Sequence, residues 1–240
     1  MVQGVQGIQV YEGNKRYAAD HGWLKSRFSF SFADYVDPNN MAFGPMRVLN
    51  DDIVAPGRGF GAHPHREMEI VSIVLQGQLQ HQDSAGHTEV TTFGGIQRMS
   101  AGTGIVHSEM NPSEEEDVHF LQLWFEPHTS GLSPSYEKAE FDQAKMVNHL
   151  LPVVMANPEG DAARIHQDLT LYLSDLQQGK HLEHVQEPNR KRFLFVIEGE
   201  LLVNGSIKLG RRDAARMTDV TSIRLDAQSD CRFMLIDLPA

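Results

Sequence analysis

Hydrophobic residues in this chain fall in short stretches rich in Val, Ile, Leu and Phe. Glycine or Asn-Gly interrupts these stretches roughly every ten residues, a spacing typical of the short strands of an all-β sandwich or barrel. Helical periodicity is scarce, so we predict only short helices, around residues 139–150 and 32–35.

An internal repeat indicates that the chain contains the same β fold twice. Three segments of the first half recur in the same order in the second: 73–79 (IVLQGQL) as 195–201 (FVIEGEL), 97–100 (QRMS) as 215–218 (ARMT), and 121–124 (LQLW) as 235–238 (LIDL). Each member of the first pair predicts a strand, a tight glycine turn and a returning strand. Matches in a conserved order predict a duplicated domain.

The two halves are separated by a proline-rich stretch from Glu126 to Glu159, whose prolines interrupt any long regular element. We therefore predict an all-β chain of two antiparallel, jelly-roll-like β-barrel domains packed together, with few short helices. The expected limits are 1–135 for the N-terminal domain, 136–159 for the linker and 160–240 for the C-terminal domain.

Charge and cysteine content exclude several classes of function. The formal net charge is -11, so release of counterions from a phosphate backbone cannot drive tight binding, and no direct nucleic-acid partner is expected. The single cysteine, Cys231, excludes an intrachain disulfide. Residues 1–10 lack a signal-peptide pattern, and no window approaches the ~20 apolar residues of a membrane span. We expect a cytoplasmic protein without a membrane partner.

Two pairs of potential metal ligands have the spacing of a strand. His63 and His65 lie two residues apart, so their side chains project from the same face of a strand. His107 and Glu109 repeat this spacing on a second predicted strand. Three imidazoles and one carboxylate suit Fe(II) or Mn(II), whereas a closed tetrahedral shell is typical of structural zinc. We predict one mononuclear site formed by these four residues.

The glycines and histidines of both segments resemble cupin motifs. The pattern Gly57-x5-His63-x-His65-x3-Glu69 is similar to the first cupin motif, and Gly102-x-Gly104-x2-His107-x3-Asn111 to the second. More narrowly, the chain resembles the pirin family and its bacterial quercetin 2,3-dioxygenase-like branch. The segments that carry this likeness are 47–52 (RVLNDD), 59–65 (GFGAHPH), 81–84 (HQDS) and 100–109 (SAGTGIVHSE), and it extends over nearly the whole chain.

The resemblance implies a bicupin with one divalent transition metal ion, held only in the N-terminal barrel by His63, His65, His107 and Glu109. Fe(II) is favoured, with Mn, Ni, Co, Cu and Zn as alternatives. The repeat places Leu225 opposite His107 and Ala227 opposite Glu109, so the C-terminal barrel is expected to be metal-free. Glu69 stands where many cupins bind metal, and we assign it a supporting role behind the ligands or that of an alternative ligand.

The resemblance further implies a metal-dependent dioxygenase that opens the central ring of a flavonol such as quercetin and releases carbon monoxide. Its partners would be a small aromatic substrate and dioxygen, and Glu109 would be the catalytic general base. Candidates for an apolar substrate slot, or else for plain barrel core, are Phe43, Met46, Phe60 and Trp124.

Other roles stay open. His81 and His119 are expected at the surface or behind the ligands. Because the pirin family also includes nuclear transcription co-regulators, a second hypothesis is a non-catalytic, redox-responsive regulatory protein that binds a protein partner. A third is a metal-dependent isomerase or another dioxygenase, since fold does not fix function. The sequence does not identify the metal in the cell, the physiological substrate or the oligomeric state.

Overall fold

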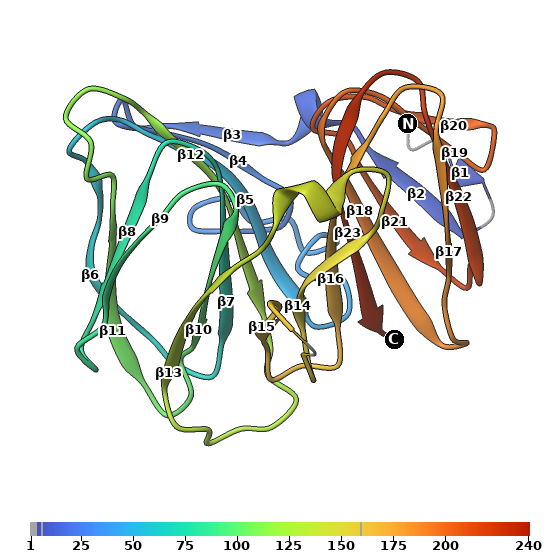
Figure 1. The fold of residues 1–240 in the computed structure, drawn as a ribbon. Coiled ribbons are helices and arrows are strands. Elements are labelled where there is room, and N and C mark those ends of the chain that lie inside the picture. Colours follow the sequence, from blue (N-terminus) through green and yellow to red (C-terminus); the bar gives the residue numbers. More distant parts are fainter. Residues whose placement is uncertain (1–3, 6, 159) are drawn as a thin grey trace. The chain divides into compact units, whose positions relative to one another are not determined.

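The computed structural model describes residues 4–5, 7–158 and 160–240, which are almost entirely β-strand (Figure 1). They form two compact units. We call residues 17–141 with 156–167 the N-terminal unit, and residues 1–16 with 142–155 and 168–240 the C-terminal unit. Residues 1–3, 6 and 159 lie outside the described residues. Residues 1–3 and 6 belong to the segment 1–10, in which we expect no signal peptide.

The N-terminal unit consists of two antiparallel sheets. Its strands are β3 (Tyr17–Asp20), β4 (Leu24–Phe28), β5 (Met46–Val54), β6 (Gly59–His65), β7 (Glu69–Gln76), β8 (Leu79–Asp83), β9 (Thr88–Thr91), β10 (Gly95–Ser100), β11 (Ile105–Met110), β12 (Val118–Phe125) and β13 (Ser135–Glu140), with the short β15 (Ala163–Arg164). Seven strands pair in the order β13-β10-β7-β12-β5-β4-β3, and four in the order β6-β11-β8-β9.

The C-terminal unit has two sheets of related design. Its elements are β1 (Gly4–Val5), β2 (Ile8–Tyr11), the 3-10 helices η1 (Gly13–Lys15) and η2 (Gln143–Met146), β14 (Leu151–Met155), β16 (Thr170–Leu176), β17 (His181–Val185), β18 (Arg190–Glu198), β19 (Leu201–Val203), β20 (Ile207–Leu209), β21 (Ala214–Thr218), β22 (Ser222–Ala227) and β23 (Cys231–Pro239). One sheet runs β1-β2-β21-β18-β23-β16-β14, and the other β17-β22-β19-β20.

The strand orders confirm the predicted duplication. The run β10-β7-β12-β5-β4 of the N-terminal unit corresponds to β21-β18-β23-β16-β14, and β6-β11-β8-β9 to β17-β22-β19-β20. The repeated glycine follows from the turn, because Gly77 and Gly199 have φ of +77° and +84°. A Cβ there would lie 2.5 Å and 2.2 Å from the carbonyl oxygens of Asp117 and Asp230, so only glycine fits.

The compact units divide the chain differently from the expected limits of 1–135, 136–159 and 160–240. Strand β2 pairs with β21, so the first residues of the chain complete the C-terminal unit. This pairing covers an edge that β21 would otherwise expose. The three expected ranges describe the two copies of the repeated sequence and the linker between them, and in that sense they stay a prediction.

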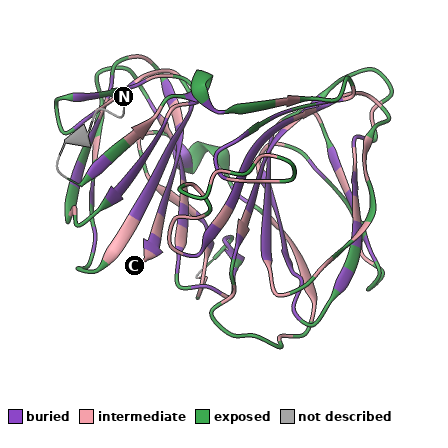
Figure 2. Cartoon of the chain, turned by 180° about the vertical axis from the view of Figure 1, so that it is seen from behind, coloured by how far each residue is buried: buried purple, intermediate pink, exposed green. Residues whose placement is uncertain are grey.

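The two expected helices are largely wrong. Strand β13 extends to Glu140, and only Gln143–Met146 coil, as a 3-10 helix that Asp142 caps by accepting the Ala144 N–H. Around residue 33 the chain forms a tight turn closed by a bridge between Phe32 and Tyr35. Buried positions follow the strands of each unit, and exposed ones the turns (Figure 2). Among the described residues, we find no helix whose length and hydrophobicity would let it span a bilayer.

Candidate metal centre

Strands β6 and β11 bring three imidazoles together. They pair antiparallel with His107 directly opposite His63, and His65 follows on the same face of β6. The ring centroids are 4.4 Å apart for His63 and His107, 4.8 Å for His63 and His65, and 4.9 Å for His65 and His107. One ring nitrogen of each lies within 4.8 Å of the others. Three of the four predicted ligands therefore converge.

The donor atoms of this cluster fit a divalent cation. Nδ1 of His63 lies 2.8 Å from the Gly61 carbonyl oxygen, which can only accept, so Nδ1 carries the proton and Nε2 keeps its lone pair. That Nε2 lies 3.0 Å from Nε2 of His107. Two nitrogens bound at right angles at about 2.1 Å from one metal would be about 3 Å apart. Nε2 of His65 is buried and has no hydrogen-bond partner among the described residues.

The environment keeps two of these imidazoles, His65 and His107, neutral. Burial, followed by the nearby His63, lowers the pKa of His65 to about 4. Burial and the neighbouring imidazoles lower the pKa of His107 to about 2. Metal ions bind the neutral ring, and its lone pair is therefore available over the whole neutral range.

His107 is supported from behind by a second imidazole and a carboxylate. Its Nδ1 faces Nδ1 of His81 at 3.4 Å, and Nε2 of His81 lies 3.1 Å from Oδ2 of Asp83. The His81 ring also stacks on Tyr136 with centroids 4.2 Å apart. Such a chain fixes the orientation of a ligand ring. His119 lies elsewhere, with Nε2 2.6 Å from Oδ1 of Asp51.

Glu109 lies close to the cluster but is held by other groups. Its carboxylate is buried and accepts hydrogen bonds from the Ser72 hydroxyl at 3.0 Å and the Gln122 amide at 2.5 Å. Burial raises its pKa to about 7, although both hydrogen bonds act in the opposite direction. Within the described residues, the set of mutually close ligand atoms comprises the three imidazoles without this carboxylate. Its roles as fourth ligand and as general base stay predictions.

Glu69 lies apart from the imidazoles. It begins β7, and its Oε2 accepts from the Ser100 hydroxyl at 2.9 Å and the His166 backbone N–H at 3.1 Å. The spacing from His65 does not place it on the same face, because the chain turns between β6 and β7, with Glu67 at a φ of +50°. Ligand spacing is informative only within one strand.

A cavity of about 420 Å³ adjoins the centre. His63 and Glu109 form part of its wall, and the other lining residues are His21, Trp23, Leu24, Ser26, Phe28, Phe32, Ala33, Asn50, Asp52, Phe60, Gln122 and Trp124. Trp124 joins the two regions, since its ring meets those of His65 and Phe32 edge-on at 4.8 Å and 5.3 Å. This size and aromatic lining suit a small planar ligand.

Two of the four residues expected around the substrate, Phe60 and Trp124, line this cavity. Met46 is fully buried and pairs with Phe43 in a β-bridge, and neither is part of the lining. A β-bulge explains the position of Phe60, because β11 shifts register against β6 so that Glu109 pairs with Phe60. Sequence reasoning missed the walls contributed by β4 and β5.

The C-terminal unit has an apolar interior at the corresponding strands. Ile223, Leu225 and Ala227 of β22 are buried in one cluster with Leu201 and Val203 of β19. Leu225 and Ala227, the residues matched to the predicted ligands His107 and Glu109, thus pack as ordinary core. That this unit binds no metal stays a prediction.

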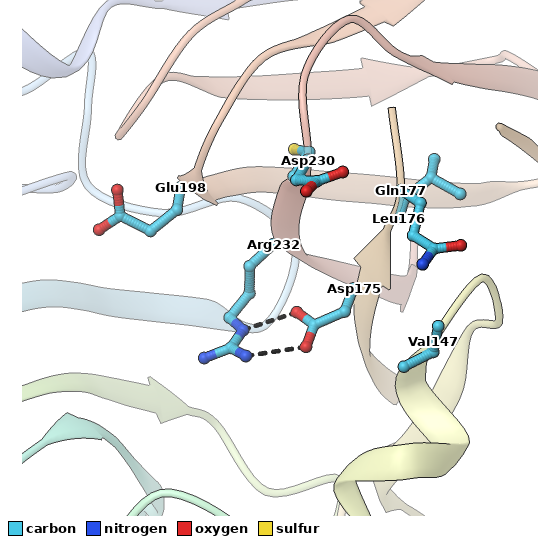
Figure 3. Close-up of a pocket in the computed structure, with 8 residues that line it drawn as sticks. Val147, Asp175, Leu176, Gln177, Glu198, Asp230 and Arg232 are labelled. Carbon is cyan, nitrogen blue, oxygen red and sulfur yellow. Dashed lines mark hydrogen bonds and ion pairs between the residues drawn. The ribbon is translucent and has the colours of Figure 1, made fainter. Parts of the chain in front are cut away.

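The C-terminal unit also has a cavity, of about 430 Å³, in which Arg232 and Asp175 already hold each other (Figure 3). Arg232 and Asp175 form a two-pronged ion pair at 2.6 Å and 2.8 Å. Burial raises the pKa of the Cys231 thiol to about 12, so this side chain is no thiolate nucleophile at neutral pH. The imidazole cluster makes the cavity of the N-terminal unit the stronger candidate site.

A duplicated jelly-roll fold with a three-histidine centre in one unit defines a bicupin. Comparison with known proteins agrees. The Pirin family profile matches residues 11–125, and that of the quercetinase C-terminal cupin domain matches residues 153–238. A relative from Escherichia coli (strain K12), named quercetin 2,3-dioxygenase, is 41% identical over 97% of this chain and 99% of its own. The chain belongs to the pirin family.

Solved structures support the same assignment. The crystal structure of YhhW from Escherichia coli covers 97% of both chains at 40% identity and a TM-score of 0.93. A structure described as bacterial pirin YhhW in complex with nickel(II) covers 97% of this chain and 99% of its own, at 39% identity and a TM-score of 0.92. The predicted family and the two-domain fold are therefore confirmed.

Proposed function

We propose that this protein is a metal-dependent dioxygenase that opens the central ring of a flavonol such as quercetin and releases carbon monoxide. The observation that carries the proposal is the convergence of three imidazoles at the edge of an aromatic-lined cavity that also contains a buried carboxyl group. Relatives named quercetin 2,3-dioxygenase support this reaction class.

The metal ligands in this proposal are His63, His65, His107 and Glu109. Fe(II) is the favoured ion, and the nickel(II) complex of a similar protein supports a divalent metal in general. When bound, such an ion supplies a Lewis acid that lowers the pKa of the enolic hydroxyl of the substrate and a centre at which substrate and dioxygen meet. To join the imidazoles, Glu109 exchanges one of its present hydrogen bonds for the ion.

Glu109 also acts as the general base. A carboxylate beside the ion can accept the proton of the 3-hydroxyl of the substrate. The hydroxyl of Ser72 and the amide of Gln122 hold this carboxylate in place. Trp124 and Phe32 form an edge-on ring pair that orients a flat substrate and excludes water.

Aerobic and anaerobic incubation of purified, metal-analysed protein with quercetin tests this proposal. We expect loss of the flavonol absorbance and release of carbon monoxide only in air. His107→Ala should abolish both, whereas His119→Ala, which removes an imidazole outside the cluster, should keep most of the turnover. Full metal occupancy without turnover would refute the proposal and favour a regulatory protein or another substrate.

A further inference from the structure

A row of buried polar residues crosses the inner face of the seven-stranded sheet. The directly paired positions are Gln97 with Ser72, Ser72 with Gln122, and Gln122 with Asn50. Gln97 donates to Thr91, although its Oε1 has no partner among the described residues; the Ser72 hydroxyl lies between Oε1 of Gln122 and Oε1 of Glu109, and Gln122 donates to Glu109. The row thus leads from the sheet interior to the cavity beside the imidazoles.

At the end of the row nearest the cavity, polar side chains have few or no hydrogen-bond partners. Asn50 is 4% exposed, and its Oδ1 is buried without a hydrogen-bond partner in the described part of the chain. Asp52, also 4% exposed, follows on the same face of β5, and among the described residues the Ser26 hydroxyl supplies the one hydrogen bond to its side chain. Nε1 of Trp124 is likewise buried and unpartnered there. All three residues line the cavity.

Such unpaired groups cost folding free energy, and native proteins rarely bury them without a reason. A ligand that supplies the missing partner removes this cost when it binds. The aromatic residues next to this polar patch indicate the shape of the ligand. Phe28 pairs with Asn50 across β4 and β5, and its ring meets that of Phe32 at 5.1 Å. A flat ring bearing a polar substituent fits both features.

We propose that Asn50 and Asp52 are specificity-determining residues that bind a second hydroxyl group of the planar aromatic substrate, one other than the hydroxyl deprotonated at the centre. This inference rests on the proposed function for the identity of the substrate. A phenolic hydroxyl both donates and accepts, so it can donate to Oδ1 of Asn50 while it shares a proton with Asp52.

The environment of Asp52 is consistent with this role. Burial raises its pKa to about 7, the nearby Asp51 and Glu109 act in the same direction, and the Ser26 hydrogen bond opposes them. Near neutral pH the group is therefore present both as an acceptor and as a donor. Either form can hold a hydroxyl, while neither gains anything from an apolar ring edge.

Isothermal titration calorimetry tests the proposal with the full-length protein loaded with Ni²⁺ and kept free of dioxygen. The two probes are quercetin and 3-hydroxyflavone, which has the same ring system and lacks the four further hydroxyls. We expect wild-type protein to prefer quercetin, and Asp52→Asn to weaken quercetin binding about tenfold, with a change below about twofold for 3-hydroxyflavone. Asp51→Asn, one residue away on the other face of β5, should leave both affinities unchanged.

Asn50→Leu separates recognition from a purely structural role. It removes the buried unpartnered oxygen and keeps the volume, so the protein should become more resistant to urea while it loses preference for quercetin. Unchanged discrimination in both Asp52→Asn and Asn50→Leu would overturn the inference. If wild-type protein binds both probes as expected but consumes neither in air, the proposed function fails and the recognition stands. If it binds neither probe, both fail.

Discussion

The same strand order carries polar, reactive groups in the N-terminal unit and an apolar core in the C-terminal unit. The C-terminal unit also buries a charged side chain, Arg192, but this side chain has hydrogen-bond partners. It is fully buried and donates to Nδ1 of His184 and to the carbonyl oxygens of His184, Val220 and Thr221. In the N-terminal unit, His65 and Asn50 bury atoms without a partner among the described residues, and these atoms belong to the imidazole cluster and to the lining of the cavity. The comparison indicates that the N-terminal unit is distinguished by unsatisfied polar groups gathered around one cavity, rather than by buried polarity as such.

The largest effect that this comparison predicts comes from removing a ligand. His107→Ala deletes one of the three converging nitrogens and leaves His63 and His65 as an incomplete set. We expect the metal content to fall from about one ion per chain to below roughly a tenth, because loss of a ligand should exceed the 10–100-fold effects of its supporting residues. Elemental analysis after dialysis measures this, with Leu225→Ala as the matched control.

The same Leu225→Ala variant, which serves as the control for metal content, should have a large effect on stability. Leu225 is fully buried in an apolar cluster, so its truncation leaves a cavity. We expect a loss of about 3 kcal/mol in the free energy of unfolding, by urea titration of the metal-free protein. Metal content should stay unchanged. A loss of bound metal in this variant would show that the C-terminal unit contributes to metal binding.

The buried carboxyl group of Asp52, in the N-terminal unit, should make the folded protein less stable as the pH rises. The pKa of Asp52 is raised from 3.8 to about 7 in the folded chain, so between these values the folded state keeps a proton that the unfolded state has lost. Stability from this group is complete below pH 3.8 and is lost as the pH rises through about 7. Relative to Asp52→Asn, metal-free wild-type protein should lose roughly 3 kcal/mol between pH 4 and pH 7.

Urea titrations of the two proteins across this range measure that difference, and groups common to both cancel. A parallel pH dependence in wild type and variant would contradict the assigned burial of Asp52. Asp51→Asn should reduce this loss, because the nearby Asp51 helps to raise the pKa of Asp52.

The smallest predicted effect concerns the support behind His107. Asp83→Asn keeps the size of the side chain but weakens its hold on His81, which faces His107. We expect a 10–100-fold loss of metal affinity, equivalent to about 1.4–2.7 kcal/mol, with the fold intact. Competition with a chelator of known affinity measures it. An affinity equal to that of wild type would mean that His81 does not orient the ligand.

Local patterns were enough to predict the duplicated all-β fold and the convergence of the three imidazoles. The glycine turns at 77 and 199 reflect a positive φ and a close backbone contact, which leave a clear mark in the sequence. His63, His65 and His107 obey the two-residue period within strands and needed only the pairing of β6 with β11.

What was missed depends on long-range pairing. The predicted helix near 139–150 failed at its start because β13 pairs with β10 as far as Glu140, and this contact outweighs local helical preference. Asn50 and Asp52 stand in an ordinary strand sequence, and their position in the cavity depends on the register of β5 against β4 and β12. The position of Glu69 likewise depends on the turn between β6 and β7.

The composition of the cavity wall has a practical consequence. The chain contains two tryptophans, Trp23 and Trp124, and both line this one cavity. Its entire indole emission therefore originates from the place where a ligand would sit, and the C-terminal unit contributes none. Any molecule that enters should alter the fluorescence of the native protein directly, without an attached dye, so libraries of aromatic compounds can be screened optically before a substrate is known.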